Sequence, residues 1–360
     1  MHVRSARLVL VATAVAATTL SLAGPALADD GDRGRGKPGF SIQEAVDKAR
    51  PGDTIHIPSG TYDESVVIST DGITLRGRNV VIEPRTADPT PCDEAPRVSG
   101  ICITDEVLFP TDPEGEVEVV DAVRNVTIRG ITVTGATGDG LVGLGTENLD
   151  VRDSAFKDNG GYGAASFVGK GTTFENNTAK GNHEAGFYVG DSPDSGAEVK
   201  GNYSADNELG FFFRSASDGE ARRNVAEGNC FGVLVLADAP GPAADWEIRD
   251  NKVRNNSKVC ADPSGSGGFL SGAGILLLGA TDFEVRDNTV TGNVSKSEGP
   301  SLAEGGIVVR TGFGGTAPTG TIGDNRVRDN APADLVWDES GDVEFDDNRC
   351  RTSLPDGLCD

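Results

Sequence analysis

Aromatic residues are scarce in this sequence: Phe, Trp and Tyr make up only 6% of the 360 residues, and there is a single Met. With 49 glycines, this composition favours an array of short strands joined by tight turns. Basic residues are also the minority, and the formal net charge is -24. Such a charge argues against nucleic acid as a partner, because few groups could replace the counterions around phosphate. It also argues against a polyanionic sugar, unless a divalent cation bridges the two.

Long apolar runs are absent except for Leu8–Leu22, which follows Arg4 and Arg7 and precedes the small residues Ala26–Ala28. We interpret residues 1–28 as a signal peptide with an A-x-A cleavage site. The run is too short for a membrane anchor and no stop-transfer flank follows it. The sequence therefore predicts a secreted, extracellular protein with no membrane span.

No two of the six cysteines have the C-x-x-C spacing of a zinc or redox site. In an oxidising compartment disulfides are the default, and bridges between cysteines close in sequence would each close one loop or the tail. Six cysteines allow 15 connectivities. The pairing that we favour is Cys92/Cys102, Cys230/Cys260 and Cys350/Cys359.

Asparagine recurs in pairs whose members are five residues apart. An alternating segment precedes each first Asn, and Gly with an apolar run follows each second Asn. Three short strands per turn of about 23 residues, without helical segments between them, predict an all-β, right-handed, single-stranded parallel β-helix. Stacked Asn side chains should form hydrogen-bonded ladders. The pairs are Asn177/Asn182, Asn202/Asn207, Asn224/Asn229, Asn251/Asn256, Asn288/Asn293 and Asn325/Asn330.

The sequence before the repeats predicts a cap for the array. Ser41 to Glu44 form a capping box, which indicates a short capping α-helix over residues 41–50. We expect a flexible linker over 29–39 and one β-helix domain over 40–360. Its repeats should cover about 54–349, with a disulfide-closed tail over 350–360.

The run from Ser41 to Gly77 resembles the opening of bacterial secreted β-helix proteins of the pectate-lyase-like superfamily. The Asn-rich turns resemble NosD-like parallel β-helix repeats, and the two resemblances cover almost all of the chain after the signal peptide. The superfamily includes lyases, hydrolases, epimerases and adhesins, so the resemblance implies the fold and not one activity. Neither the calcium site of the lyases, nor the packed aspartates of the hydrolases, nor the Asp-Pro-His-Asp motif of alginate epimerases is intact here.

Two columns of charge precede the Asn positions, one acidic and one basic. Stacked like charges repel, so neighbouring columns of opposite sign stabilise a parallel stack, and we interpret them as structural surface ion pairs. The acidic column is Glu198, Glu220, Glu247, Glu284 and Glu344, and the basic column is Arg152, Lys200, Arg222, Arg249 and Arg286.

An outward apolar stripe follows the glycines. Such a stripe on a soluble protein predicts a covering loop, a partner or bound sugar rings. Insertions at 260–272 and 295–305 precede its C-terminal half and are expected to cover it. Tyr188 and Phe212 have short flanking loops and are expected to form an open platform. The stripe is Ala165, Tyr188, Phe212, Leu234, Leu276 and Val308.

Polar residues gather around this platform in the sequence. A base, a cation and a stacking ring are the groups that uronic-acid chemistry needs, although a lone surface His is more often incidental. We predict no metal site from motifs and leave Ca²⁺ open as a cofactor. The predicted catalytic residues are His183, Glu184, Asp191 and Arg214, and the predicted substrate-binding residues are Tyr188, Phe212, Glu208, Asp139 and Arg310.

The function that these patterns favour is an exported, monomeric β-helix protein that binds or modifies a polysaccharide or cell-envelope glycan, with uronates among the candidates. The alternative is a non-catalytic cell-surface or extracellular structural module. Whether the protein is an enzyme is left open, and a lyase, a hydrolase and an epimerase are the reactions considered.

Overall fold

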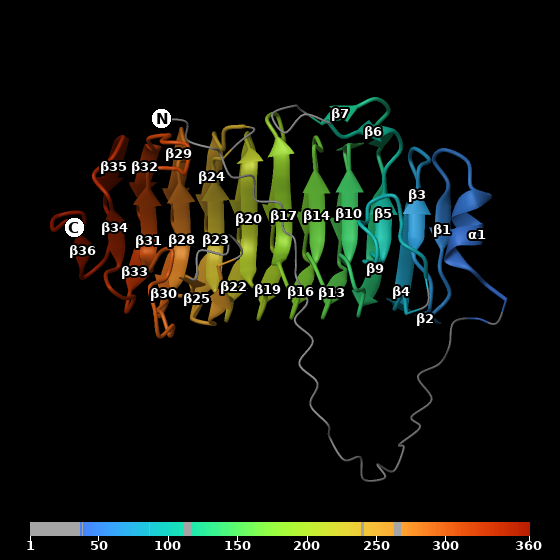
Figure 1. Cartoon of the computed structure of the whole chain (residues 1–360), viewed down its shortest axis with the longest axis horizontal. Helices are drawn as coiled ribbons and strands as arrows, with labels where there is room; N and C mark the ends of the chain where they lie inside the picture. Colours follow the sequence, from blue (N-terminus) through green and yellow to red (C-terminus); the bar gives the residue numbers. More distant parts are fainter. Residues whose placement is uncertain (1–36, 38, 86, 111–116, 239–240, 263–267) are drawn as a thin grey trace, which may run out of the picture.

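The computed structural model describes residues 37–360 except 38, 86, 111–116, 239–240 and 263–267. The predicted signal peptide and most of the predicted linker lie outside the described residues. One short helix, α1 (Ile42–Asp47), lies at the N-terminal end of a long stack of strands (Figure 1). Ser41 Oγ accepts a hydrogen bond from the Glu44 amide at 3.1 Å, as expected of an N-cap. None of the described helices is long and apolar enough to cross a bilayer.

The stack has three parallel sheets, which we call first, second and third in the order in which each turn of the chain meets them. The chain is the predicted right-handed parallel β-helix, and equivalent residues of successive turns pair in register. The first sheet contains β1 (Thr54–His56), β4 (Thr74–Ile82), β9 (Thr127–Thr134), β12 (Asp150–Arg152), β15 (Thr173–Glu175), β18 (Ala197–Lys200), β21 (Gly219–Arg222), β24 (Trp246–Arg249), β29 (Phe283–Arg286), β32 (Thr319–Gly323) and β35 (Asp342–Asp346).

The second sheet continues from the first around the coil. Strands β4 and β9 are long enough to run through both sheets, which joins them at the N-terminal end. Its other members are β2 (Gly60–Tyr62), β13 (Ala155–Lys157), β16 (Thr178–Lys180), β19 (Tyr203–Ala205), β22 (Val225–Glu227), β25 (Lys252–Arg254), β30 (Thr289–Thr291) and β33 (Arg326–Arg328).

The third sheet faces the viewer in Figure 1 and carries the outward stripe. Its strands are β3 (Val66–Ile68), β5 (Ile101–Ile103), β10 (Leu141–Leu144), β14 (Ala164–Phe167), β17 (Ala185–Ser192), β20 (Leu209–Ala216), β23 (Phe231–Leu236), β28 (Ala273–Leu278), β31 (Gly305–Arg310), β34 (Leu335–Trp337) and β36 (Ser353–Leu354).

Three short two-stranded sheets accompany the main sheets of the coil. The antiparallel hairpin β6 (Val107–Leu108) and β7 (Glu118–Val119) lies near the C-terminal ends of the third-sheet strands (Figure 1). A second antiparallel pair, β26 (Cys260–Ala261) and β27 (Phe269–Leu270), belongs to the insertion before β28. β8 (Val123–Arg124) and β11 (Thr146–Glu147) pair in parallel.

The predicted Asn ladders are confirmed. The amide and Nδ2 of Asn177 both donate to Asn202 Oδ1, at 2.9 and 3.2 Å, and each later rung repeats this arrangement. The residue before each buried ladder Asn turns the chain with a positive φ, as at Asn176 (φ 55) and Gly181 (φ 71), which Asn, Asp and Gly tolerate best. The ladders end on carboxylates: Asn330 donates to Asp334, and the Asn348 amide donates to Asp360.

The charged columns also form the expected ion pairs. Glu220 accepts from Arg222 on its own rung at 2.7 Å and from Arg249 on the next rung. Each such surface pair contributes about 0–1 kcal/mol, so their effect is mainly to neutralise the stacked charges.

Stacked aromatic rings fill the middle of the coil. Phe187 and Phe211 stack with ring centroids 5.4 Å apart, and Phe213 stacks on Trp246 at 3.8 Å. All four side chains are buried. Removing such a ring from a close-packed core costs about 3–5 kcal/mol, so the scarce aromatics are concentrated where they stabilise the stack most.

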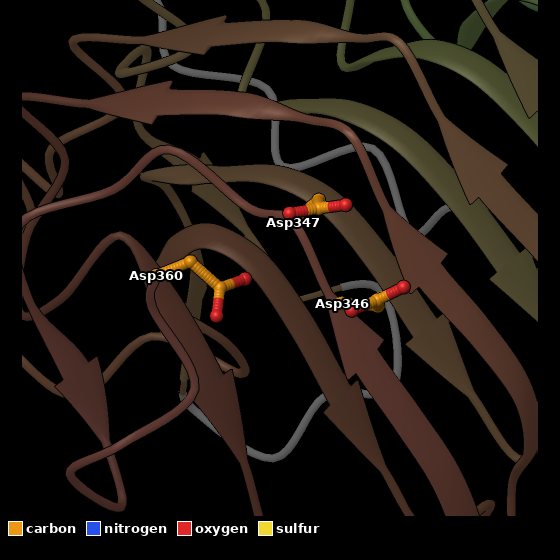
Figure 2. A group of neighbouring side chains, drawn as sticks. All are labelled: Asp346, Asp347 and Asp360. Atoms are coloured by element: carbon orange, nitrogen blue, oxygen red, sulfur yellow. The ribbon is translucent and has the colours of Figure 1, made fainter.

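The C-terminal end carries an exposed acidic group, drawn in Figure 2. Asp346, Asp347 and Asp360 bring carboxylate oxygens within 4.8 Å of one another. The cluster lies beside the end of one Asn ladder, since Asp360 Oδ2 accepts the Asn348 amide at 3.0 Å.

Candidate functional site

Four aromatic side chains pack together on the outer face of the third sheet, and we call them the aromatic patch. Tyr188 lies at the centre, with ring-centroid distances of 4.6 Å to Tyr162, 4.7 Å to Phe167 and 5.2 Å to Phe212. Tyr188 is only 1% exposed, whereas the other three rings stay partly exposed. The expectation that Tyr188 forms an open platform is therefore wrong, because its neighbours cover it. Phe212 keeps a partly open face.

Gly190 explains why the Tyr188 ring is covered. A Cβ at Gly190 would lie 2.0 Å from Tyr188 Oη, so the ring lies along β17 over a residue without a side chain. Burial is the largest cause of a raised pKa at Tyr188, and the neighbouring Asp191 adds to it. The phenol therefore stays protonated at neutral pH, and its hydroxyl lies within hydrogen-bonding reach of Arg214.

Three carboxyl groups lie at the N-terminal ends of third-sheet strands, before β10, β17 and β20, and we call them the carboxylate row. Glu184 and Glu208 occupy equivalent positions on adjacent rungs, because Ala185 pairs with Leu209 in the register. Stacked positions in a parallel sheet are about 4.8 Å apart. Asp139 completes the row: its Oδ1 accepts the Tyr162 amide at 2.6 Å.

A disulfide-closed loop brings one cation to this row. Arg97 Nη2 lies 3.3 Å from Glu184 Oε1 and donates to the Gly160 carbonyl at 3.1 Å. The Cys92–Cys102 bridge and Asp93, whose Oδ1 accepts the Ser99 hydroxyl at 2.6 Å, hold the loop against the coil. The sequence analysis missed Arg97 because nothing in the repeat pattern connects this loop to Glu184.

Two members of the row titrate near neutrality. Burial, followed by the charge of Glu184, raises the pKa of Asp139 to about 7. The same two causes raise the pKa of Glu208 to about 7, although Lys258 acts in the opposite direction. Carboxyl groups that gain and lose protons near the working pH are suited to general acid–base chemistry.

A separate polar group lies at the C-terminal ends of β17 and β20. Arg214 Nε donates to both oxygens of Asp238, at 3.0 and 3.1 Å, and the Ser215 hydroxyl donates to the same residue. Burial raises the pKa of Asp191, and its Oδ1 is buried with no hydrogen-bond partner among the described residues. The structure thus places predicted Arg214 and Asp191 at the opposite end of the aromatic patch from the carboxylate row.

Two predicted residues join neither group. The His183 side chain is exposed, next to Glu184 in the sequence. Arg310 matches Arg214 in register, as expected, but the rungs of Leu236 and Leu278 lie between them. Three rung spacings amount to about 14 Å, so the two arginines do not act on one ligand group.

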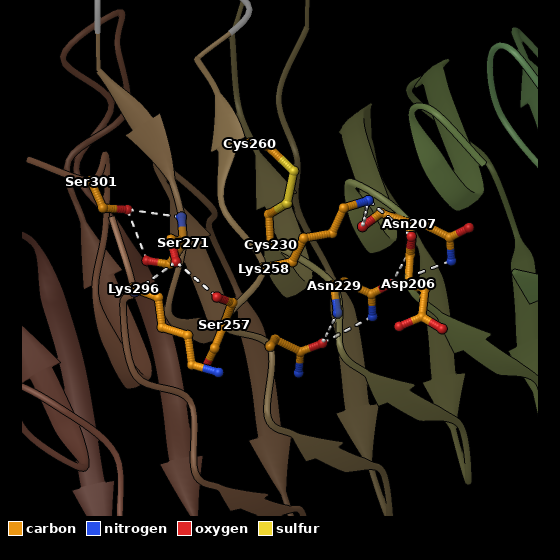
Figure 3. The surroundings of a disulfide bond; sticks show 11 residues. Asp206, Asn207, Asn229, Cys230, Ser257, Lys258, Cys260, Ser271, Lys296 and Ser301 are labelled. Carbon is orange, nitrogen blue, oxygen red and sulfur yellow. Dashed lines mark hydrogen bonds between the residues drawn. A yellow bond between two sulfur atoms is a disulfide. The ribbon is translucent and has the colours of Figure 1, made fainter. Parts of the chain in front are cut away.

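The C-terminal half of the stripe is covered, as the insertions predicted. Leu234, Leu276 and Val308 are buried together with Leu270 of the insertion. Figure 3 shows the Cys230–Cys260 bridge that holds this insertion against the coil.

All three predicted disulfides are present. Their Cα–Cα distances are 5.8 Å for Cys92–Cys102, 6.0 Å for Cys230–Cys260 and 5.3 Å for Cys350–Cys359. These distances lie in the ordinary range for a disulfide. Each bridge closes a loop or the tail, which leaves the coil itself to be held by backbone pairing and packing.

Comparison with known proteins extends these findings. Residues 111–267 match the family described as "Periplasmic copper-binding protein (NosD)", and no curated protein sequence matches the chain. A mutant of the periplasmic alginate epimerase AlgG is 14% identical with a TM-score of 0.55, covering 85% of this chain and 82% of its own.

Two further solved structures resemble the chain. The Azotobacter vinelandii mannuronan C-5 epimerase AlgE6 A-module is 18% identical with a TM-score of 0.48, covering 86% of this chain and 95% of its own. A Yersinia enterocolitica family 28 exopolygalacturonase is 16% identical with a TM-score of 0.49, covering 89% and 75%. At such identities a likeness shows fold alone. With its repeats and register, this chain is a parallel β-helix, and residues 111–267 of it match the NosD family.

Proposed function

We propose that this chain is an exported protein that binds a polysaccharide across the aromatic patch and acts on it with the carboxylate row. The observation that carries the proposal is the meeting of the two features. Partly exposed Tyr162 belongs to the patch and also donates its amide to Asp139 of the row. Aromatic rings offer an apolar face to sugars, while a row of carboxyl groups offers hydrogen bonds and protons.

The reaction that the row supports best is hydrolysis of a glycosidic bond. Hydrolysis needs one protonated carboxyl group to protonate the leaving oxygen and one carboxylate to activate water or attack the sugar. Glu208, with a pKa of about 7, supplies the acid. Glu184, which Arg97 contacts at 3.3 Å, supplies the carboxylate.

Uronate lyase or epimerase chemistry fits the site less well. Both reactions need a cation to stabilise the substrate carboxylate while a proton is removed. Arg214, the predicted cation, is already bound to Asp238 through both carboxylate oxygens. Fold neighbours that are described as alginate epimerases keep this chemistry among the alternatives by analogy only.

Glycan-array binding of the purified protein tests the proposal. Phe212→Ala should weaken binding to the best glycan by about tenfold, because it removes one partly exposed ring of the patch. Phe313→Ala is the matched control: Phe313 is 66% exposed, follows β31 three rungs from β20, and should leave binding unchanged. Binding to no glycan, or equal loss in both variants, would contradict the proposal.

The second candidate is a non-catalytic binding module. The burial of Tyr188 and the closed Arg214–Asp238 pair favour it, because both leave those groups unavailable to a substrate. Release of reducing ends from the bound glycan distinguishes the two functions. Loss of this release in Glu208→Gln, with binding retained, would establish hydrolysis. Binding without any release by the unmodified protein would establish the module.

A further inference from the structure

The charges around the aromatic patch are strongly unbalanced. Among the described residues, five carboxyl groups and two cations lie at its N-terminal end. The acidic groups are Asp93, Asp139, Glu184, Glu208 and Asp262, and the cations are Arg97 and Lys258.

Both cations are already bound within the protein. Arg97 donates to Glu184 and to the Gly160 carbonyl. Lys258 donates to the carbonyl of Asp206 at 2.9 Å and contacts that of Asn207 at 3.4 Å, as Figure 3 shows. A ligand carboxylate at this end would therefore meet more carboxyl groups than cations, and both cations would have to leave their present partners to bind it.

The C-terminal end of the patch is also unfavourable for a ligand carboxylate. Arg214 is held by Asp238, and Asp191 brings another carboxyl group beside them. A ligand carboxylate would have to displace Asp238 from its arginine, in surroundings that are largely buried. Such an exchange gains no ion pair in total and still requires the ligand carboxylate to be dehydrated.

A bridging calcium ion would be the usual way to reconcile an anionic sugar with acidic residues. Across the described part of the chain, the one group of three acidic side chains close enough to share an ion is Asp346, Asp347 and Asp360. That group lies at the C-terminal end of the coil, on the last rungs and tail, far along the stack from β17 and β20 (Figures 1 and 2).

From this distribution of charge we infer that the polysaccharide is uncharged or amino-bearing, and that Glu184 and Glu208 are the residues that reject uronates. The inference rests on the proposed polysaccharide function and specifies its substrate class. Stacked carboxyl groups about 4.8 Å apart repel a ligand carboxylate together but accept hydrogen bonds from hydroxyl or amino groups.

Affinity measurements on a panel of polymers test this inference. The panel contains neutral hexans, chitin and chitosan fragments, polygalacturonate and alginate, each at low ionic strength with a chelator present. The protein should bind a neutral or amino-bearing polymer at least about tenfold more tightly than either uronan. If a uronan is the tightest ligand without calcium, the inference is wrong and the proposed function stands. If no polymer binds, the proposed function itself fails and the inference fails with it.

A double variant assigns the effect to the two residues. At about pH 8.5, where Glu208 with its pKa of about 7 is ionised, Glu184→Gln with Glu208→Gln should raise uronan affinity by about tenfold, because it removes two repelling charges and keeps the side-chain shapes. Glu198→Gln with Glu220→Gln is the matched control, since these residues also stack on adjacent rungs, on the first sheet. At this pH the two doubles change net charge equally. An equal gain in both would assign selectivity to overall charge and overturn the role of Glu184 and Glu208.

Discussion

Replacing Glu208 by Gln should stabilise the protein above neutral pH and have little effect in acid. The pKa of this carboxyl group is about 7 in the folded chain, against an ordinary 4.5. The folded state therefore binds the proton more tightly than the unfolded state does. Stability from this group is complete below the unfolded pKa and is lost as the pH rises from about 4.5 to about 7.

The size of the effect follows from the two pKa values. Their difference corresponds to at most about 3 kcal/mol of unfolding free energy. Glu208 is partly exposed, so solvent screening reduces the expected gain for Glu208→Gln to about 1–2 kcal/mol at about pH 8. Urea unfolding followed by circular dichroism at about pH 5 and about pH 8 measures the gain directly.

A control separates this effect from the general loss of one negative charge. Glu198 has a side chain that is 49% exposed and paired with Lys200, so Glu198→Gln should not reproduce the gain at high pH. The reasoning is refuted if Glu208→Gln and the unmodified protein differ by the same amount at both pH values. In that case burial and the charge of Glu184 would not govern the titration of Glu208.

Three further predictions concern packing and covalent structure. Asn251→Ala should lower the free energy of unfolding by about 2–4 kcal/mol, because Asn251 links its rung to both neighbouring rungs through buried hydrogen bonds. Urea unfolding measures this loss, and a loss below about 0.5 kcal/mol would contradict the ladder's role. Gly190→Ala should force the Tyr188 ring outward, because a Cβ would overlap its hydroxyl. Increased quenching of tyrosine fluorescence by acrylamide would report the exposed ring, and unchanged quenching would exclude the outward movement. Replacing Cys230 and Cys260 by Ser removes a bridge with a sequence separation of 30; stability should fall by about 2–4 kcal/mol, and binding of a hydrophobic dye should rise as the insertion leaves the coil. Equal dye binding before and after would show that packing alone holds the insertion.

Much of the fold could be predicted because its causes recur locally. Each Asn follows a residue that accepts a positive φ, and each apolar position recurs in the next turn, so one period carries the information for the whole coil. The disulfides could be predicted for the same reason, since each joins cysteines at most 30 residues apart.

The candidate site was only partly predictable because its decisive contacts are not periodic. The pattern correctly gave Tyr188 an outward direction, but whether its ring stands out or lies down depends on Gly190 and on rings from neighbouring rungs. Arg97 reaches Glu184 across 87 residues of sequence, through a loop that the repeat does not describe. Asp238, which binds Arg214, likewise follows the end of a strand and belongs to no column.

The Asn-to-Asn hydrogen bonds of the two ladders all point one way, although each Nδ2 also donates back to a carbonyl of the preceding rung. Each Asn amide donates to the Asn Oδ1 of the next rung toward the C-terminal end, and the last amides meet Asp334 and Asp360. An ionised carboxylate only accepts, so it cannot pass a donor on to another layer. The ladders therefore end at these carboxylates. The first rung of a second molecule, placed against this end, would find no N–H donor for its Asn side-chain oxygens. An open stack of strands is thereby protected from growing end to end into a fibre.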